Sequence, residues 1–469
     1  MSANLPSQVH AFGDDALGNH DAVGLVEALA SGAVSRAEAL EAAIARIETV
    51  NPHLNAVVVK DFDRARTTTP AKGYFAGVPS IIKDNSDVAG LPTQQGSSAY
   101  RARAKKKDGD LARHFLSTGL VNLGKSQLSE FGFSASAEFP DRDPVRNPWS
   151  TAHSSGASSA GSAVLVASGA LPIAHANDGG GSIRIPAACN GLVGLKPSRG
   201  RVLGDAATRS LPVRIIADGA VTRSVRDTAA FFREYERSYA APGLPAIGDV
   251  TGPSDQRLRI GVVLHSPVGP SDPELVTAVR GVASLLESLG HHVEEVEAPV
   301  PDTFTDDFLL YWSLLAALEL GAGKLLLDPS FKASKTDNLS RGLARNARRN
   351  LRHIPGAIKR LKASSEQSAD FYKSYDLTLN PTLAAPTPEL GWLNPAQPYE
   401  VIIENLMSWV RFTPLQNATG DPAISLPLAT DSRGLPLGVQ LGAPIGHERR
   451  LLEVAYELEA AHPFARLGG

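Results

Sequence analysis

Short apolar segments alternate with Gly- and Ser-rich turns and helix-like stretches through the centre of this chain, from about residue 75 to 230. Candidate strands lie at 78–82, 120–123, 173–176 and 191–195, and candidate helices at 111–118 and 159–168. Strands that alternate with helices in this way favour an α/β fold. We therefore expect a central mixed, twisted β-sheet flanked by helices on both faces.

The flanking regions extend this pattern. Ser35 and Glu38 have the spacing of a capping box ahead of an amphipathic helix, and Pro52 is expected to end that helix. Residues 258–296 predict a strand–helix–strand unit. Further strands are expected at 376–381 and 423–427, and a C-terminal helix at 448–460.

Composition excludes several classes of protein. The 469 residues include a single Cys, which rules out an internal disulfide and a clustered-cysteine zinc site. The net charge of −3 argues against a general nucleic-acid binder. The N-terminal residues resemble no secretory signal, and no run of about 18 apolar residues occurs. We expect a cytoplasmic protein that binds neither membranes nor nucleic acid and holds no metal.

Residues 301–370 are helical in pattern and poor in Gly, and many basic side chains fall between Lys332 and Lys362. Two interpretations are available for this basic segment. It is either the solvated face of surface helices or a patch that faces RNA. A run of charges usually marks a solvated face, so we favour the first interpretation.

The densest chemical signal is a pair of Ser/Gly-rich loops. The first is GASSAGS at 156–162, and the second is NDGGGSIRIP at 177–186. Glycine adopts backbone conformations closed to other residues, so consecutive N–H groups can converge on an oxyanion. A tight turn is the alternative explanation for the glycines, but the second Ser-rich loop upstream favours a catalytic site.

A nucleophilic serine in these loops needs a base, and the residues leave several candidates. His153 and His175 lie nearby in the sequence, and either could form a Ser–His pair. A buried lysine is the alternative, because burial lowers the pKa of an amine toward neutrality. Three lysines in apolar phrases fit this description: Lys83, Lys125 and Lys196.

Other common catalytic motifs are missing from the sequence. It contains no HExxH, no P-loop and no GxGxxG after a strand, and GASSA narrowly misses the GxSxG pattern. The one cysteine, Cys189, lies in the apolar phrase IPAACNGLVGL and is expected to be a small buried hydrophobic residue.

Several phrases of the chain together resemble the amidase signature family. They are FAGVPSIIKDN (75–85), GASSAGS (156–162), NDGGGSIRIPAACNGLVGLKPSRG (177–200), GAVTRSVRDTA (219–229) and NATGDPAISLPLATDSRGLPLGVQLGAP (417–444). The resemblance covers about residues 20–460 and implies one continuous domain over 1–469. Residues 301–370 would then be a variable helical insertion.

The resemblance implies amide hydrolysis by a Ser–cisSer–Lys triad without a cofactor. Ser182 would be the nucleophile that carries an acyl group, Ser158 the bridging serine and Lys83 the base. The Ala157–Ser158 peptide bond is then expected to be cis. The family usually has Gly at the positions of Ala157 and Ala160, but neither alanine removes a catalytic group.

The glycines before Ser182 acquire a role in the same way. The backbone N–H groups of Gly179, Gly180 and Gly181, with that of Ser182, are expected to surround the oxyanion. Asp178 and Arg184 bracket the glycines. We interpret this pair as an ion pair that holds the loop in shape rather than as catalytic groups.

The substrate is less well determined. Phe131, Phe133, Trp312 and Trp409 are candidates for an apolar pocket suited to aryl or medium-chain acyl amides, although each could equally be a core residue. The phrases PIAHANDGGGSIRIPA and HSPVGPSDPE are similar to the bacterial branch that contains 6-aminohexanoate cyclic-dimer hydrolases. We expect a small-molecule amide, linear or cyclic, as the substrate, and a homodimer is compatible with the sequence.

Two alternatives accompany this interpretation. The first is the A subunit of a glutamyl-tRNA amidotransferase, which the basic segment would favour. However, His447 stands where the family usually has a carboxylate in a late Gly-Asp-Glu phrase. The second is a non-catalytic binding protein on an amidase scaffold, against which the joint presence of Lys83, Ser158 and Ser182 argues.

Overall fold

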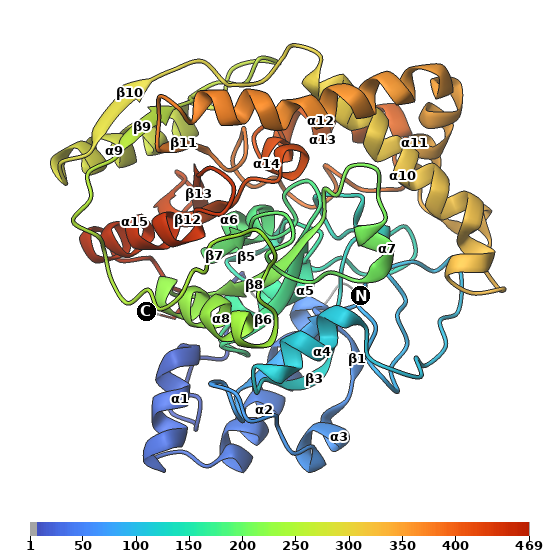
Figure 1. Cartoon of the computed structure of the whole chain (residues 1–469). Helices are drawn as coiled ribbons and strands as arrows, with labels where there is room; N and C mark the ends of the chain where they lie inside the picture. The colour runs from blue at the N-terminus through green and yellow to red at the C-terminus, as the bar shows by residue number, and fades with distance from the viewer. Residues whose placement is uncertain (1–6, 469) are drawn as a thin grey trace.

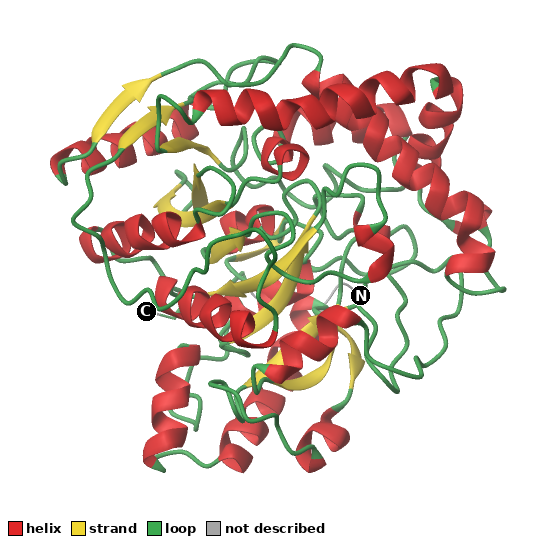
Figure 2. Cartoon of the chain, viewed as in Figure 1, coloured by secondary structure: helices red, strands yellow, loops and turns green. Residues whose placement is uncertain are grey.

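The computed structural model describes residues 7–468 and shows a mixed α/β architecture, as expected (Figures 1 and 2). Residues 1–6, part of the stretch expected to carry no signal, lie outside the described residues. The fold contains an eight-stranded sheet, a three-stranded sheet and a two-stranded ribbon.

The helices and strands have the following bounds. The helices are α1 (Ala22–Ser31), α2 (Arg36–Leu54), α3 (Phe62–Thr67), α4 (Asp110–Ser117), α5 (Ala160–Ala167), α6 (Arg184–Asn190), α7 (Ala206–Arg209), α8 (Val225–Ser238), α9 (Pro273–Ser288), α10 (Phe304–Leu326), α11 (Asn338–Arg349), α12 (Ile354–Phe371), α13 (Tyr399–Trp409), α14 (Pro414–Thr419) and α15 (Glu448–Ala461). The strands are β1 (Val57–Lys60), β2 (Pro79–Lys83), β3 (Val121–Ser126), β4 (Arg146–Asn147), β5 (Ser150–Ser154), β6 (Ile173–Asp178), β7 (Val193–Lys196), β8 (Ala217–Thr222), β9 (Arg259–Val262), β10 (His292–Glu295), β11 (Leu377–Pro381), β12 (Ala423–Thr430) and β13 (Pro436–Gly442).

The large sheet has the strand order β10-β9-β11-β13-β12-β7-β8-β6. Its first three strands pair in parallel, and the remaining neighbours pair antiparallel, so the sheet is mixed. Strands β9 and β10 are joined through α9, which confirms the strand–helix–strand unit predicted over 258–296. Two strands of this sheet, β8 and β13, were not among the strands predicted from the sequence.

Two of the predicted strands lie outside the large sheet. Strands β2 and β3 form the small sheet with β1, in the order β1-β3-β2. The edge strand β2 contacts β6 of the large sheet through side chains: Ser80 Oγ donates to the carbonyl of Ile173 at 2.9 Å. The backbone N–H of Lys83 donates to Nδ1 of His175 at 3.2 Å. These contacts bring the end of β2 beside the end of β6.

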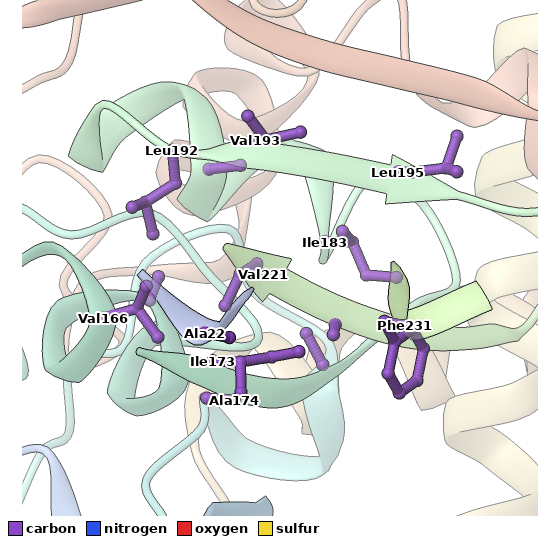
Figure 3. Close-up of a cluster of buried hydrophobic side chains, with 14 of the residues drawn as sticks. Ala22, Val166, Ile173, Ala174, Ile183, Leu192, Val193, Leu195, Val221 and Phe231 are labelled. Atoms are coloured by element: carbon purple, nitrogen blue, oxygen red, sulfur yellow. The ribbon is translucent and has the colours of Figure 1, made fainter. Parts of the chain in front are cut away.

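Helices cover both faces of the large sheet (Figure 1). Helices α5 and α6 pack together on one face, and α8 and α15 pack together on the other. Strands β6, β7 and β8 lie side by side in the buried core, where they present apolar side chains such as Ile173, Val193 and Val221 (Figure 3). Phe231 of α8 closes this cluster from the helix side.

The capping box predicted near the N-terminus is present, but the helix end was placed wrongly. Ser35 and Glu38 cap the start of α2 as expected. Pro52 does not end the helix, which continues to Leu54 and finishes with Asn55 in the left-handed conformation. A proline near a C-terminus loses only one helical hydrogen bond, and the burial of Leu54 favours completing the last turn.

The segment 301–370 forms the helical layer α10–α12 at the edge of the molecule (Figure 1). Its basic side chains, among them Arg345, Arg348 and Arg352, are exposed, as expected for a solvated face. By length and composition, α10 is the one described helix that could cross a membrane. In this structure α10 packs against α11 and α12.

Candidate active site

Lys83 lies at the end of β2 and reaches the loop that precedes α5. Its Nζ is 2.7 Å from Ser158 Oγ and 2.9 Å from Ser159 Oγ. The same Nζ donates to Oδ1 of Asn177, in β6, at 2.6 Å. The contact between β2 and β6 therefore places the predicted base and the predicted bridging serine within hydrogen-bond distance.

The surroundings of Lys83 favour its neutral form. The side chain is fully buried, and this desolvation lowers the pKa of Lys83 to about 7, against the opposing effect of the more distant Asp218 and Asp178. Among the described residues, no carboxylate forms an ion pair with it. A substantial fraction of Lys83 is therefore an uncharged amine near neutral pH, and an uncharged amine can accept a proton.

Ser182 lies in the loop between β6 and α6 and faces a pocket that Ala157 also lines. The Ala157–Ser158 peptide bond is cis, which confirms that prediction. The described residues show no hydrogen bond between Ser182 and Ser158.

The loop before Ser182 is held by Asp178, the last residue of β6. Its carboxylate accepts hydrogen bonds from the backbone N–H of Gly181 at 2.7 Å and of Ile183 at 3.2 Å. Asn417 Nδ2 donates to it at 2.8 Å, and Arg184 Nε at 2.9 Å. Burial alone would raise the pKa of Asp178, but Arg184 and the other donors lower it to about 2.

Gly181 must be glycine. It has a φ of +131°, and a Cβ there would lie 2.3 Å from Oγ1 of Thr413. The N–H of Gly181 is already bound by Asp178. In contrast, the backbone N–H groups of Gly179, Gly180 and Ser182 donate to none of the described residues. Three of the four N–H groups expected at the oxyanion thus remain available.

Arg184, at the start of α6, connects this loop to distant parts of the chain. Its guanidinium forms the predicted ion pair with Asp178 and is fully buried. It also donates to Oε1 of Gln416 at 2.8 Å, to Oε1 of Gln440 at 2.9 Å and to the carbonyl of Thr413 at 2.8 Å. Arg184 therefore supports the shape of the loop and does not point at the nucleophile.

The structure assigns other partners to the alternative bases. His175, in β6, is buried, and its Nε2 lies 3.3 Å from Oδ1 of Asp218. His153 bonds to Ser150. Lys125 forms a buried ion pair with Asp84.

Lys196 and Cys189 are also buried away from the two serines. Lys196 is fully buried and donates to the carbonyl of Pro197 at 2.7 Å. Cys189 is fully buried in an apolar cluster, as predicted, and burial raises the pKa of its thiol to about 12. Among the described residues, no group of three or more His, Cys, Asp or Glu side chains could hold a metal ion.

The pocket in front of Ser182 is partly open to solvent, and most of its walls are apolar. The side chains that line it beyond Ser182 and Ala157 are Phe133, Ala135, Ile185, Phe308, Leu309, Trp312, Ile403, Leu406, Met407, Val410 and Pro414. The rings of Phe308 and Trp312 stack at 6.0 Å, and Trp312 meets Phe133 edge-on at 5.5 Å. Helices α10 and α13 contribute three of these side chains each.

Two of the aromatic residues predicted for this pocket lie elsewhere. Trp409 is buried behind the wall, where its Nε1 donates to the carbonyl of Ala385 at 2.9 Å and its ring stands edge-on to Trp392. Phe131 lines a larger, open cleft that also reaches Asn177 and that Phe133 shares. The spacing of aromatic residues in a sequence does not show which side of a wall each one occupies.

Sequence reasoning missed several residues of the site. Asn177 and Ser159 contact Lys83 although neither was singled out, and both lie within the phrases that carry the family resemblance. Thr413 donates to the carbonyl of Gly180 at 2.6 Å from a part of the chain more than 200 residues away. No local pattern identifies such a partner.

Comparisons with known proteins agree with this geometry. The model of the family named Amidase matches residues 38–452. AmiC of Mycobacterium leprae is 55% identical over 98% of this chain and 99% of that protein. The 6-aminohexanoate-cyclic-dimer hydrolase of Paenarthrobacter ureafaciens is 35% identical over 95% of each chain. A solved structure of 6-aminohexanoate cyclic dimer hydrolase, 33% identical, superimposes with a TM-score of 0.86 over 96% of this chain and 98% of that one.

The fold, the sequence match and the clustered serines and lysine define the class of protein. The chain belongs to the amidase family. It is a hydrolase that acts on amides.

Proposed function

We propose that the chain hydrolyses carboxylic acid amides through an acyl-enzyme on Ser182, with Ser158 and Lys83 as its proton relay. The observation that carries the proposal is the 2.7 Å contact between the buried Lys83 Nζ and Ser158 Oγ, together with a pKa of Lys83 of about 7. A neutral amine in this position can accept the hydroxyl proton of Ser158.

The neighbours of Lys83 orient its lone pair. A neutral amine has two N–H bonds and one lone pair. Asn177 Oδ1 can only accept a hydrogen bond, and Ser159 Oγ donates its own hydrogen to the carbonyl of Asn177 at 3.2 Å. Both N–H bonds of Lys83 are therefore used on these two residues, and the lone pair is left facing Ser158.

The reaction then follows in two halves. Ser158 passes its proton to Lys83 and takes the proton of Ser182, whose oxygen attacks the amide carbonyl carbon. When the carbon–nitrogen bond breaks, the relay returns the proton to the departing amine or ammonia, and the acyl group stays on Ser182. Water then attacks the ester, and the same relay moves its proton to release the acid and free Ser182.

The oxyanion formed at each attack is bound by backbone donors. The N–H groups of Gly179, Gly180 and Ser182 have no partner among the described residues and are the available donors. We exclude Gly181 from the set predicted from the sequence, because its N–H is bound to Asp178. Loss of one such donor typically lowers the rate by about 100-fold or more.

The acyl group of the substrate is proposed to occupy the apolar pocket before Ser182. Its stacked Phe308 and Trp312 favour aryl or medium-chain acyl groups. The relatives named as cyclic-dimer hydrolases support small cyclic amides as further substrates. The amine part would leave through the open cleft that reaches Asn177.

We also propose that the enzyme is cytoplasmic and acts without a nucleic-acid or membrane partner. The basic side chains of α11 and α12 are exposed, as on an ordinary solvated face, and we assign them no nucleic-acid partner. No observation on the described residues favours an amidotransferase subunit, and the intact set of Lys83, Ser158 and Ser182 argues against a non-catalytic scaffold.

Turnover of an aryl amide such as hexanoyl p-nitroanilide tests the proposal. Ser182→Ala is expected to lose activity to background because the nucleophile is gone. Lys83→Ala should lose about 1,000-fold or more, since the relay has no base. Lys335→Ala, a change of an exposed lysine on the insertion, should leave activity unchanged. Full activity of Ser182→Ala would contradict the proposal.

A further inference from the structure

A second cavity lies behind the acyl pocket and takes no part in the mechanism. It is a narrow cavity that is partly open to solvent. Its apolar walls come from side chains such as Val263, Val300, Phe304 and Phe412, and its polar lining includes Arg411.

The two cavities share their dividing wall. In the segment 410–416, Val410 and Pro414 line the acyl pocket, whereas Arg411, Leu415 and Gln416 line the second cavity. Helix α10 divides in the same way, with its first turn facing the second cavity and the next turns facing the acyl pocket. A molecule in the second cavity would therefore touch the elements that shape the substrate site.

Two polar side chains in this cavity, the half-buried Arg411 and the buried Gln416, have donors that no described residue uses. No carboxylate among the described residues lies within ion-pair distance of Arg411, whose only hydrogen bond runs to the carbonyl of Pro270 at 3.0 Å. Its Nε is buried without a partner. Gln416 is 5% exposed, and its Nε2 donates to none of the described residues.

We propose that this second cavity binds an apolar monocarboxylate, with its carboxylate on Arg411 and Gln416 and its hydrocarbon part against the apolar walls. A guanidinium and an amide N–H are donors that suit a carboxylate. Asp421 also lines the cavity; burial raises the pKa of its carboxyl group, which favours the neutral acid beside a bound carboxylate, and Ser368 Oγ donates to it at 2.6 Å. The ligand class is the one that the reaction releases, a statement that rests on the proposed function.

Occupation of the cavity acts through Gln416 on the loop that precedes Ser182, residues 179–181, called here the catalytic loop. The Oε1 of Gln416 accepts a hydrogen bond from Arg184, which holds Asp178 and, through it, Gly181. A carboxylate bound to Nε2 of the same amide would shift Gln416 and disturb this chain of contacts. The enzyme would then be inhibited by its own acid product at a site apart from Ser182, with a fall in kcat.

Binding is tested by calorimetric titration with hexanoate. The enzyme is first labelled on Ser182 with an octyl fluorophosphonate, which fills the acyl pocket. Arg411→Gln and Ala298→Phe, which remove the cation and fill the cavity, should each weaken hexanoate binding by about tenfold or more. Arg345→Gln, a change of an exposed arginine, should leave the affinity unchanged, and hexan-1-ol should bind at least tenfold more weakly than hexanoate.

Inhibition kinetics on the unlabelled enzyme supply the second readout. Hexanoate should lower kcat of the wild-type enzyme, and Arg411→Gln should abolish this effect while any competitive rise in KM remains. Unchanged hexanoate affinity in Arg411→Gln, or equal binding of hexan-1-ol, would overturn the proposal. If the fluorophosphonate does not react with Ser182, the proposed function fails instead, and the titration is then run on Ser182→Ala.

Discussion

Lys83 is fully buried, and its Nζ contacts two hydroxyl groups and an amide oxygen but no carboxylate among the described residues. By contrast, Lys125, which is equally inaccessible, is paired with Asp84. The difference separates two uses of a buried lysine. The paired lysine supports the structure, whereas the unpaired one is held near its neutral form and is available as a base.

The pH dependence of kcat/KM reports on this amine. Because burial lowers the pKa of Lys83 to about 7, the neutral base is present above that pH and is lost as the pH falls through it. We expect kcat/KM to rise with pH through a midpoint near 7 and then to level. Steady-state rates from pH 5 to pH 9 measure the profile.

Two variants assign this titration to a residue. Lys83→Arg should lose activity at every pH in the range, because a guanidinium stays protonated. The pKa of Lys196 is also lowered to about 7 by burial, so Lys196→Gln is the matched control and should retain the midpoint. The assignment of the base to Lys83 would be contradicted if Lys196→Gln lost the rise of kcat/KM with pH while Lys83→Arg stayed active.

At the scale of elements, chemistry and substrate selection come from different parts of the fold. The proposed triad lies where β2, β6 and the start of α5 meet. Helices α10 and α13 each supply three side chains of the acyl pocket, and α10 belongs to the helical insertion. The insertion can therefore change acyl preference without moving the catalytic groups.

Shortening Trp312 tests this division of roles. Trp312→Ala removes one ring of the stacked pair with Phe308 and enlarges the acyl pocket. The ratio of kcat/KM for octanoyl over acetyl p-nitroanilide should change by about tenfold in favour of the longer chain. The pH midpoint should stay where it is in the wild-type enzyme. An unchanged ratio would contradict the proposal that the acyl group binds against Trp312.

The elements themselves were largely predictable from local sequence, but their partners were not. Apolar runs and the Ser35–Glu38 box located most of the strands and the start of α2. Nothing local showed that β2 and β3 belong to a separate sheet, because strand pairing depends on contacts far apart in the chain. Trp409 was misplaced for the same reason: a buried indole can lie on either side of a wall.

Across the whole molecule, Arg184 joins the catalytic loop to β13 and to the segment at α14. Its partners include Asp178, Gln440 and Gln416, which lie up to 256 residues away along the chain. Of these contacts, the sequence predicted only the one with Asp178, six residues away, because the others exist only after folding. The triad residues themselves were predicted through the family resemblance, and spacing alone left three lysines and two histidines open.

Removal of Arg184 should destabilise the whole fold. Arg184→Gln leaves Asp178 buried without its counter-charge, which typically costs about 3–5 kcal/mol of unfolding free energy. Chemical denaturation at pH 7 measures the loss, and Arg345→Gln on the exposed face of α11 serves as the control. A loss no greater than that of the control would contradict the role assigned to Arg184.

The pH dependence of that loss has a definite sign. In the wild-type enzyme the pKa of Asp178 is about 2, below its usual 3.8, so its contribution to stability is present above about pH 4 and is lost as the pH falls through 2. Without Arg184, burial should instead raise the pKa of Asp178. Protonation of Asp178 would then relieve the buried charge in Arg184→Gln. The difference in unfolding free energy between this variant and the wild-type enzyme should therefore shrink as the pH is lowered from 7 to 5.

The central claim is that Ser182 carries the acyl group. The most direct measurement is mass spectrometry of the enzyme quenched during turnover of hexanoyl p-nitroanilide. A mass increase of one hexanoyl group on the peptide that contains Ser182, absent in Ser182→Ala, is the predicted result. A turning-over enzyme whose Ser182 peptide stays unmodified, or an acyl group found on another residue and retained in Ser182→Ala, would contradict it.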